Sequence, residues 1–422
     1  MHRPPDAAGV PTELIAELAR GLAAREAEGL TRRRRTIDSV RGTRVVVDGR
    51  ELVAFASNDY LGLAHHPDVV AAARDGASRW GAGAGASPLV CGHFAPHAAL
   101  EADLAAFVRP CAGARAVTFS TGYLANLAIL TALARRGDAI FADRLNHACL
   151  NDGARLSRAE FIRYPHGDVA ALERRLAAST AKRKLIATDA VFSMDGDLAP
   201  LPALCALADA HDAWLIVDDA HGFGVLGSGG DAGRGTLAHF GLASERIVYM
   251  GTLGKAAGVA GAFVAAHPTV IEALVQTARP YIFATAAPPF LAEALRVSLS
   301  IIRDDRARHA HLSALIARFR GRMRELPWTL VDSQTPIQPL VVGGNAPAVA
   351  LAGALWERGF WVPAIRPPTV PRGTARLRIT LSAAHSQADV DALLDALAAL
   401  AGESLSGGCA RYNEPDRPRT PL

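Results

Sequence analysis

The sequence has no uninterrupted apolar run of the roughly 18 residues that a membrane-spanning helix needs. The nearest candidate begins at Ala256 and is broken by His267, Pro268 and Glu272. The first residues carry prolines and acids where a secretory signal peptide has an apolar core, so we expect no export. These absences predict a cytoplasmic protein without a membrane partner.

The sequence is also poor in cysteine and in excess charge. Its five cysteines are scattered, odd in number and without a C-x-x-C pair, which argues against a disulfide framework and against a metal site. A formal net charge of +4, from 45 Lys and Arg against 41 Asp and Glu, is too small to indicate nucleic acid as the main partner. The 422 residues exceed one compact core and predict two or three domains.

From about residue 60 to residue 300, apolar runs alternate with helix-like stretches. Apolar runs separated by helices predict an α/β fold with a mostly parallel sheet. We divide the chain into an N-terminal arm (1–57), a large domain (58–300), a smaller α+β domain (301–402) and a disordered tail (403–422). The apolar runs are Ala116–Ser120, Ala139–Ala142, Leu185–Ser193, Trp214–Asp219, Ile247–Leu253 and Gly261–Ala266.

The arm contains a predicted amphipathic helix over 12–29, which Thr12 can cap and Gly29 can close. An Asp48-Gly49 pair between apolar runs predicts a β-hairpin over 44–55. Four consecutive arginines, 32–35, lie between the helix and the hairpin. Such a run is usually a solvated surface or a patch that binds RNA.

The stretch WLIVDDAHGFG (214–224) is the most informative one. It is a buried strand that ends in Asp218 and Asp219, at the sheet edge where ligands of open α/β sheets bind. Capping the following turn is a sufficient structural role for Asp219. Asp218 directly follows an apolar strand, and an ionised carboxylate there needs a positive partner.

Lys255, in the stretch YMGTLGKA (249–256), also follows an apolar strand. The stretch is not a nucleotide-binding P-loop, because its glycines are too close together and Ala256 stands where Ser or Thr binds magnesium. An isolated lysine after a strand is most often a surface residue. A desolvated lysine beside a carboxylate can instead form a Schiff base with an aldehyde cofactor.

Asp218 and Lys255 stand 37 positions apart, the length of one strand–helix–strand crossover, so we expect them on nearby strands at one edge. Pyridoxal phosphate needs this pair, a lysine for its aldehyde and an acid for its pyridine nitrogen. It also needs a phosphate site, which Gly122 and Tyr123 can form at a helix start, with Thr252 as a further donor. His147 can stack on the cofactor ring, although helix capping or packing is the more common role of such a histidine.

Taken together, the motifs resemble those of the α-oxoamine synthases, which are fold-type I pyridoxal-phosphate enzymes. The resemblance covers about residues 12–400. Within the family, the sequence is most similar to the branch that acts in biotin biosynthesis. Residues 364–380, in which two prolines follow Arg366, are typical of that branch. The matching motifs are Ser57–Leu63, Ser120–Asn126, Asp143–His147, Val191–Asp197, Val217–Gly224 and Gly251–Lys255.

The resemblance implies a role for each site residue. Lys255 holds the cofactor and is the base, Asp218 pairs with the pyridine nitrogen, and His147 stacks over the ring. The remaining cofactor contacts that it implies are Gly122, Tyr123, Ser193, His221 and Thr252. The substrate contacts that it implies are Arg32, Asn58, His147, Thr369 and Arg378, the last of which holds the amino-acid carboxylate.

The implied reaction is the decarboxylative condensation of L-alanine with a pimeloyl thioester, delivered by CoA or by an acyl carrier protein. The resemblance also implies a homodimer whose active site lies at the subunit interface. One departure concerns residues 83–92, where family members usually carry a histidine and this chain has Pro88 and Leu89. Because of this departure, the resemblance does not determine the acyl-chain preference or the rate.

Three other functions remain as alternatives. Another α-oxoamine synthase would use glycine or serine with a different acyl-CoA, and the Arg366 stretch argues against it. A non-catalytic cofactor-binding regulator would bind nucleic acid through the arginine run, but the arm is too short for the winged-helix segment that it requires. A structural protein with a vestigial fold would bind no cofactor.

Overall fold

The computed structural model describes residues 12–227 and 229–406, and its centre is a seven-stranded sheet of order β4-β10-β9-β8-β7-β5-β6. The strands from β9 to β6 are parallel, and β10 is antiparallel to both of its neighbours. The predicted mostly parallel sheet is therefore confirmed. The strands are β4 (Arg115–Phe119), β5 (Ala139–Asp143), β6 (Glu160–Tyr164), β7 (Lys184–Asp189), β8 (Ala213–Asp218), β9 (Ile247–Thr252) and β10 (Ala262–Ala266).

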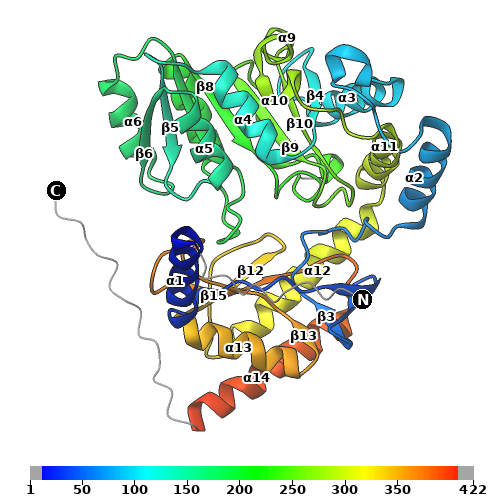
Figure 1. The fold of residues 1–422 in the computed structure, drawn as a ribbon, viewed down its shortest axis with the longest axis vertical. Helices are drawn as coiled ribbons and strands as arrows, with labels where there is room; N and C mark the ends of the chain where they lie inside the picture. The colour runs from blue at the N-terminus through cyan, green and yellow to red at the C-terminus, as the bar shows by residue number, and fades with distance from the viewer. Residues whose placement is uncertain (1–11, 228, 407–422) are drawn as a thin grey trace, which may run out of the picture.

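Helices cover both faces of this sheet (Figure 1). Side chains of successive strand residues point to opposite faces, and both faces are apolar here, so both need a cover. In β7, Ile186 enters one apolar core while Leu185 and Ala187 enter the other. One face is covered by α4 (Gly122–Leu133), α5 (Ala148–Leu156), α9 (Pro268–Thr277) and α10 (Arg279–Ile282). Helices that pack into the other core include α3 (Ala95–Val108), α6 (Val169–Ala178), α7 (Leu201–Ala210), α8 (Thr236–Phe240) and α11 (Pro289–Asp304).

A smaller α+β part lies beside the carboxyl edge of the large sheet (Figure 1). One of its sheets has the order β11-β12-β15-β14, and the other consists of β1, β2, β3 and β13. Its strands are β1 (Ile37–Arg41), β2 (Arg44–Val47), β3 (Arg50–Ala54), β11 (Thr329–Leu330), β12 (Ile337–Gly343), β13 (Phe360–Trp361), β14 (Ala364–Ile365) and β15 (Ala375–Thr380). The remaining helices are α1 (Glu13–Ala27), α2 (Pro67–Trp80), α12 (Arg306–Met323), α13 (Asn345–Glu357) and α14 (Gln387–Ser406). Of these, α2 packs on α11.

The N-terminal hairpin is built as the sequence predicts. Asp48 and Gly49, at φ of 52° and 74°, connect β2 to β3. The hairpin then joins the C-terminal part, because β3 pairs in parallel with β13. Residues separated by about 300 positions thus share one sheet, while the domain boundaries near 57, 300 and 402 stay predictions.

Several predicted details are wrong. The Thr12 side chain makes no capping hydrogen bond to α1, whereas Gly29 closes the helix at φ 64° as predicted. The strand predicted over 185–193 ends at Asp189, and a bend follows at Ala190. Residues 403–406 continue α14, so the predicted tail does not begin at Glu403, and its remainder, 407–422, lies outside the described residues.

In the part of the chain that the structure describes, no helix is both long enough and apolar enough to cross a bilayer.

Candidate active site

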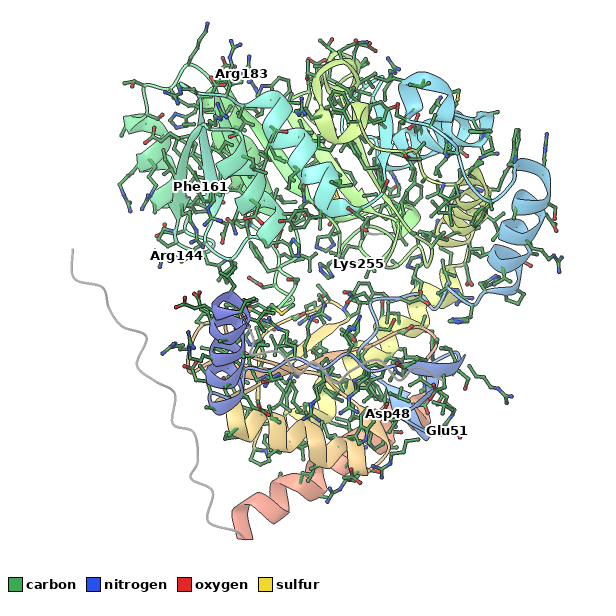
Figure 2. All side chains as sticks on the ribbon, viewed as in Figure 1. Asp48, Glu51, Arg144, Phe161, Arg183 and Lys255 are labelled. Carbon is green, nitrogen blue, oxygen red and sulfur yellow. The ribbon has the colours of Figure 1, made fainter. Side chains whose placement is uncertain are left out.

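Asp218 and Lys255 lie at one edge of the large sheet. Asp218 is the last residue of β8, and Lys255 follows the end of β9, its parallel neighbour. The predicted placement on nearby strands is therefore confirmed. Figure 2 shows Lys255 at the lower rim of the large sheet, facing the smaller part of the molecule.

The Asp218 carboxylate is buried and accepts hydrogen bonds from an amide side chain and from a backbone N–H group. Its Oδ2 accepts from Asn126 Nδ2 at 2.6 Å, and its Oδ1 accepts from the Ala220 N–H at 3.0 Å. Among the described residues, no cationic side chain pairs with it. A buried carboxylate without a cationic partner favours the binding of a cationic group beside it.

Asp219 has the structural role that its position suggested, but with different partners. Its Oδ2 accepts from the Thr236 N–H at 2.7 Å and from Tyr249 Oη at 2.8 Å, so it ties β8 to the start of α8 instead of capping the next turn. Burial raises its pKa to about 7. Asp219 is therefore a packing residue beneath the site.

Lys255 is a desolvated amine. Its Nζ lies 2.8 Å from His221 Nε2. Burial, together with the charge of Arg378, lowers its pKa to about 8, although Asp218 and Asp189 act in the opposite direction. Burial, followed by the charges of Lys255 and Arg378, holds the pKa of His221 well below its usual range, so the imidazole is neutral.

Arg378 reaches the site from β15 in the smaller part. Its Nε donates to the Ser193 carbonyl oxygen at 2.6 Å, its Nη1 to Asn58 Oδ1 at 3.1 Å and its Nη2 to Tyr60 Oη at 3.4 Å. The predicted residues Arg378, Asn58 and Ser193 are thus brought together. Ser193 contributes its carbonyl group to this arrangement, and its implied contact with the cofactor stays a prediction.

His147 is the N-cap residue of α5, so the alternative of a capping histidine is realised. Its Nδ1 accepts from the Cys149 N–H at 3.3 Å and lies 2.9 Å from Cys149 Sγ. The ring is neutral because desolvation and the charge of Lys255 lower its pKa, against the charge of Asp218. A neutral ring that accepts at Nδ1 carries its proton on Nε2, which makes Nε2 a donor.

The predicted phosphate site lies at the start of α4. Thr121 caps this helix through a hydrogen bond from the Leu124 N–H at 3.2 Å, and the first N–H groups of a helix have no partner inside it. Those groups belong to Gly122 and Tyr123. A Cβ added at Gly122 would meet only the Met250 side chain, at 3.5 Å, so the approach to this helix start is open.

Thr252 ends β9, next to this helix start, and its hydroxyl donates to the Gly261 carbonyl at 3.2 Å. It is bonded to the backbone, so its predicted contact with a phosphate stays a prediction.

Arg32 and Thr369 are both exposed and lie near each other, outside the cluster around Lys255. Arg366 connects them, since its guanidinium donates to the carbonyls of Gly29 and Thr31 and its own carbonyl accepts from the Thr369 N–H at 3.1 Å. The structure therefore places both on one surface beside α1. In the described part of the chain, no hydrogen bond or ion pair joins either side chain to the buried site residues.

Residues 50–397 match the family described as aminotransferase class I and II. The chain is 60% identical to an 8-amino-7-oxononanoate synthase of Burkholderia thailandensis, over 91% of this chain and 98% of that protein. A synthase of the same name from Polaromonas naphthalenivorans is 58% identical over 93% of this chain and 99% of the relative. The chain belongs to the 8-amino-7-oxononanoate synthase family.

Solved structures agree with this membership. A Sphingomonas wittichii serine palmitoyltransferase is 31% identical with a TM-score of 0.86, covering 95% of this chain and all of that one. The 8-amino-7-oxononanoate synthase of Francisella tularensis is 29% identical with a TM-score of 0.72, covering 84% of this chain and 99% of its own. The predicted fold-type I class and the predicted pyridoxal-phosphate-dependent acyltransferase of biotin biosynthesis are both confirmed at family level.

The site fits the pyridoxal phosphate on which this synthase family depends. Asp189 and Asp218 end adjacent strands, and both carboxylates are buried. The Oδ1 atoms of Asp189 and Asn126 are buried without a hydrogen-bond partner. These acidic and amide oxygens lie around a buried, partly neutral amine. A cationic pyridine ring requires the buried negative charge, and an aldehyde requires the amine.

Sequence reasoning missed several residues of the synthase site. Asn126 and Tyr60 lie inside the matched motifs, but their partners Asp218 and His221 are about 90 and 160 positions away. Cys149 follows the His147 motif, and its Sγ lies 4.0 Å from Asp218 Oδ2. Asp189 lies inside the apolar run predicted over 185–193, and only the structure shows that it ends a strand as Asp218 does.

Proposed function

We propose that this chain condenses L-alanine with a pimeloyl thioester to give 8-amino-7-oxononanoate, carbon dioxide and the free thiol of CoA or of an acyl carrier protein. One observation carries the proposal. Lys255 lies at 2.8 Å from His221, close to Asp218, in a hydrogen-bonded group that extends to Arg378. This group combines an amine base, an acid for a pyridine nitrogen and a carboxylate anchor.

When bound, pyridoxal phosphate supplies an electron sink for negative charge at the α-carbon of the amino acid. The buried carboxylate of Asp218 would stabilise the protonated, positively charged pyridine nitrogen. Lys255 takes the α-proton on its Nζ, and its lowered pKa puts a fraction of it in the neutral form near pH 7. His221, neutral and in contact with that Nζ, holds the amine in place.

The substrates are held by residues of the smaller part and of the arm. Arg378 fixes the alanine carboxylate with the planar fork of its guanidinium, next to Asn58. His147 covers the opposite face and can donate from Nε2 to that carboxylate. Arg32 and Thr369, on the surface joined by Arg366, contact the acyl chain or its carrier.

The remaining assignments are also part of this proposal. Ser193 and His221 would face the phenolic oxygen of the bound cofactor, and Gly122, Tyr123 and Thr252 would hold its phosphate. The protein acts in the cytoplasm as a homodimer. Exposed apolar side chains at Leu89 and Val90, in the loop whose sequence departs from the family, support a subunit contact there.

A panel of amino acids and thioesters tests the function. Purified protein is loaded with pyridoxal phosphate and given alanine, glycine or serine with pimeloyl-, acetyl-, succinyl- or palmitoyl-CoA, and with pimeloyl carrier protein. We expect 8-amino-7-oxononanoate from alanine with a pimeloyl thioester, detected by mass spectrometry. Turnover of glycine or serine without any alanine product would exclude the proposal.

A further inference from the structure

A buried chain of hydrogen bonds runs across the site from the smaller part to the large sheet. Arg378 Nη2 donates to Tyr60 Oη at 3.4 Å, and Tyr60 Oη lies 2.6 Å from His221 Nδ1. On its other nitrogen, His221 Nε2 lies 2.8 Å from Lys255 Nζ. Tyr60 Oη also donates to Asn58 Oδ1 at 3.1 Å. The Tyr60 side chain is fully buried, so water does not compete for these bonds.

Donor counting gives this chain a direction when Lys255 is charged. An ammonium can only donate, so His221 Nε2 must accept from it and the imidazole proton must sit on Nδ1. That Nδ1–H needs an acceptor, and Tyr60 Oη is the one that the structure provides. The tyrosine hydroxyl hydrogen then points to Asn58, which leaves every donor of the chain partnered.

We propose that Tyr60 is a positioning residue that ties the carboxylate anchor Arg378 to the base Lys255 through the imidazole between them. This inference rests on the proposed function, because it assigns those two residues their tasks. Tyr60 touches neither substrate nor cofactor in this account. It acts by orienting the guanidinium of Arg378 and by fixing the tautomer of His221 that accepts from the Lys255 ammonium.

Other titratable groups also face the Lys255 amine, and their effect on its pKa has to be the same in the wild type and in a Tyr60 variant. Asp218 comes from β8, Asp189 from β7 and Arg378 from β15, with neutral His147 and the Cys149 thiol at the start of α5. None of these residues is changed by the substitution Tyr60→Phe. That substitution removes one oxygen atom and keeps the ring that fills the core.

The first measurement is the rate at which the full chain, stripped of pyridoxal phosphate, captures the added cofactor as a function of pH. Capture requires the neutral amine, so its pH midpoint reports the charge state of Lys255. In Tyr60→Phe the Nδ1–H has no acceptor, the ammonium loses its partner, and we expect the midpoint to fall by about one pH unit. Circular dichroism and the melting temperature establish that the variant is folded.

The second measurement is the steady-state kinetics of the loaded enzyme. The loss of one contact to Arg378 raises the KM for alanine about 5-fold or more in Tyr60→Phe, with the KM for the thioester unchanged. Tyr164→Phe, which removes the hydroxyl of another fully buried tyrosine on β6, is the matched control and keeps the wild-type midpoint.

An unchanged capture midpoint in folded Tyr60→Phe would overturn the inference, as would an equal shift in Tyr164→Phe. Because capture uses no substrate, its result stands even if the enzyme condenses a different pair of substrates. The failure of the inference is thereby separated from the failure of the proposed function. If Tyr60→Phe does not fold, the same capture titration is made on Tyr60→His, whose ring nitrogen restores an acceptor, and a midpoint below that of the wild type overturns the inference.

Discussion

At the scale of single residues, the site depends on one buried amine. The chain has three lysines, and Lys182 and Lys184 lie at the opposite end of the large sheet from Lys255, at the start of β7. Burial separates Lys255 from the other two, since its pKa is lowered to about 8. Few lysines make the assignment of the cofactor-binding residue unusually easy to test.

Lys255→Ala removes the attachment point of the cofactor. We expect no covalent cofactor after borohydride reduction, no visible absorbance band and at least a 1000-fold loss of turnover. Peptide mass spectrometry of reduced wild-type protein should place the label on residue 255. Lys182→Ala, at an exposed position, is the control and keeps both label and activity. A label on either of the other lysines would contradict the assignment.

The lowered pKa of Lys255 makes cofactor capture depend on pH. Burial disfavours the ammonium, so with a pKa of about 8 roughly one amine in ten is neutral at pH 7 and most are neutral at pH 9. The capture rate should therefore rise about 10-fold from pH 7 to pH 9 and then level off. Stopped-flow absorbance measures it, and a rate that keeps rising to pH 10.5 would indicate an unperturbed lysine.

Asp218→Asn removes the buried negative charge and keeps a side chain of nearly equal size. We expect kcat to fall at least 100-fold, because the pyridine nitrogen loses its anionic partner, while the KM for alanine changes little. Steady-state kinetics of the loaded variant measures both values. Asp212→Asn, on the exposed turn before β8, is the control. A KM increase with an unchanged kcat would assign Asp218 to substrate binding instead.

The sequence was sufficient to predict Asp218 and Lys255, because each directly follows an apolar strand and the two strands are one crossover apart. It was insufficient for Tyr60 and Asn126. Their roles arise from hydrogen bonds to residues more than 90 positions away, and no local pattern encodes such contacts. His147 shows a third case, since capping and a site position coincide in one side chain.

At the scale of elements, a short turn joins the two parts of the molecule. The turn over 192–197 is closed by the Phe192 N–H to Asp197 carbonyl bond at 3.0 Å. On one side His166 bonds to Asp197 at 2.8 Å and to Asp143 at 3.0 Å. On the other side, Arg378 and Arg376 from β15 bond to Ser193 and Asp195. The large sheet and the smaller part of the molecule are therefore both hydrogen-bonded to this turn.

His166 therefore stabilises the fold in a pH-dependent way. Burial lowers its pKa, but the two aspartates outweigh burial and raise it to about 10. A raised pKa gives stability that is complete below the ordinary value near 6.5 and is lost as the pH rises to about 10. His166→Ala should lower the melting temperature by roughly 2 °C at pH 6 and by much less at pH 10.

Scanning calorimetry of wild type and variant at both pH values measures this difference. His239→Ala, at an exposed position of α8, serves as the control and should show no pH-dependent loss. Equal destabilisation by His166→Ala at the two pH values would mean that packing on Phe192, rather than charge, is what the histidine contributes.

Element boundaries show what periodicity encodes. The strands of the large sheet were predictable because they are apolar on both faces, whereas β6, with exposed Glu160 and Arg163 at the sheet edge, has no such pattern. The short stretch over 360–365 is divided into β13 and β14, which belong to different sheets. Which sheet a two-residue strand joins depends on tertiary pairing, and the local sequence does not contain it.

At the scale of the whole molecule, the loop over residues 83–92 exposes apolar side chains. Leu89 and Val90 are 49% and 78% exposed, and Phe283, 69% exposed, lies on the segment that bonds to this loop through Ala286 and Ala86. Isolated apolar residues are common on surfaces, but a group of three suits the proposed subunit interface.

Leu89→Asp combined with Val90→Asp introduces two charges into the proposed interface. We expect a particle of about 44 kDa, one chain, in place of twice that mass by sedimentation. Activity should fall with dimer content, because the proposed site draws on both subunits. The control is Val70→Asp with Leu156→Asp, two exposed apolar positions elsewhere, and dissociation by that pair would argue against the loop as the interface.

In the proposed condensation, alanine loses its own carboxyl group as carbon dioxide. Carboxyl-labelled L-[1-¹³C]alanine and a pimeloyl thioester test it in one reaction, with labelled carbon dioxide, free thiol and product measured together. We expect equal amounts of all three, with no label in the 8-amino-7-oxononanoate. Thiol release without labelled carbon dioxide, or product that keeps the label, would contradict it.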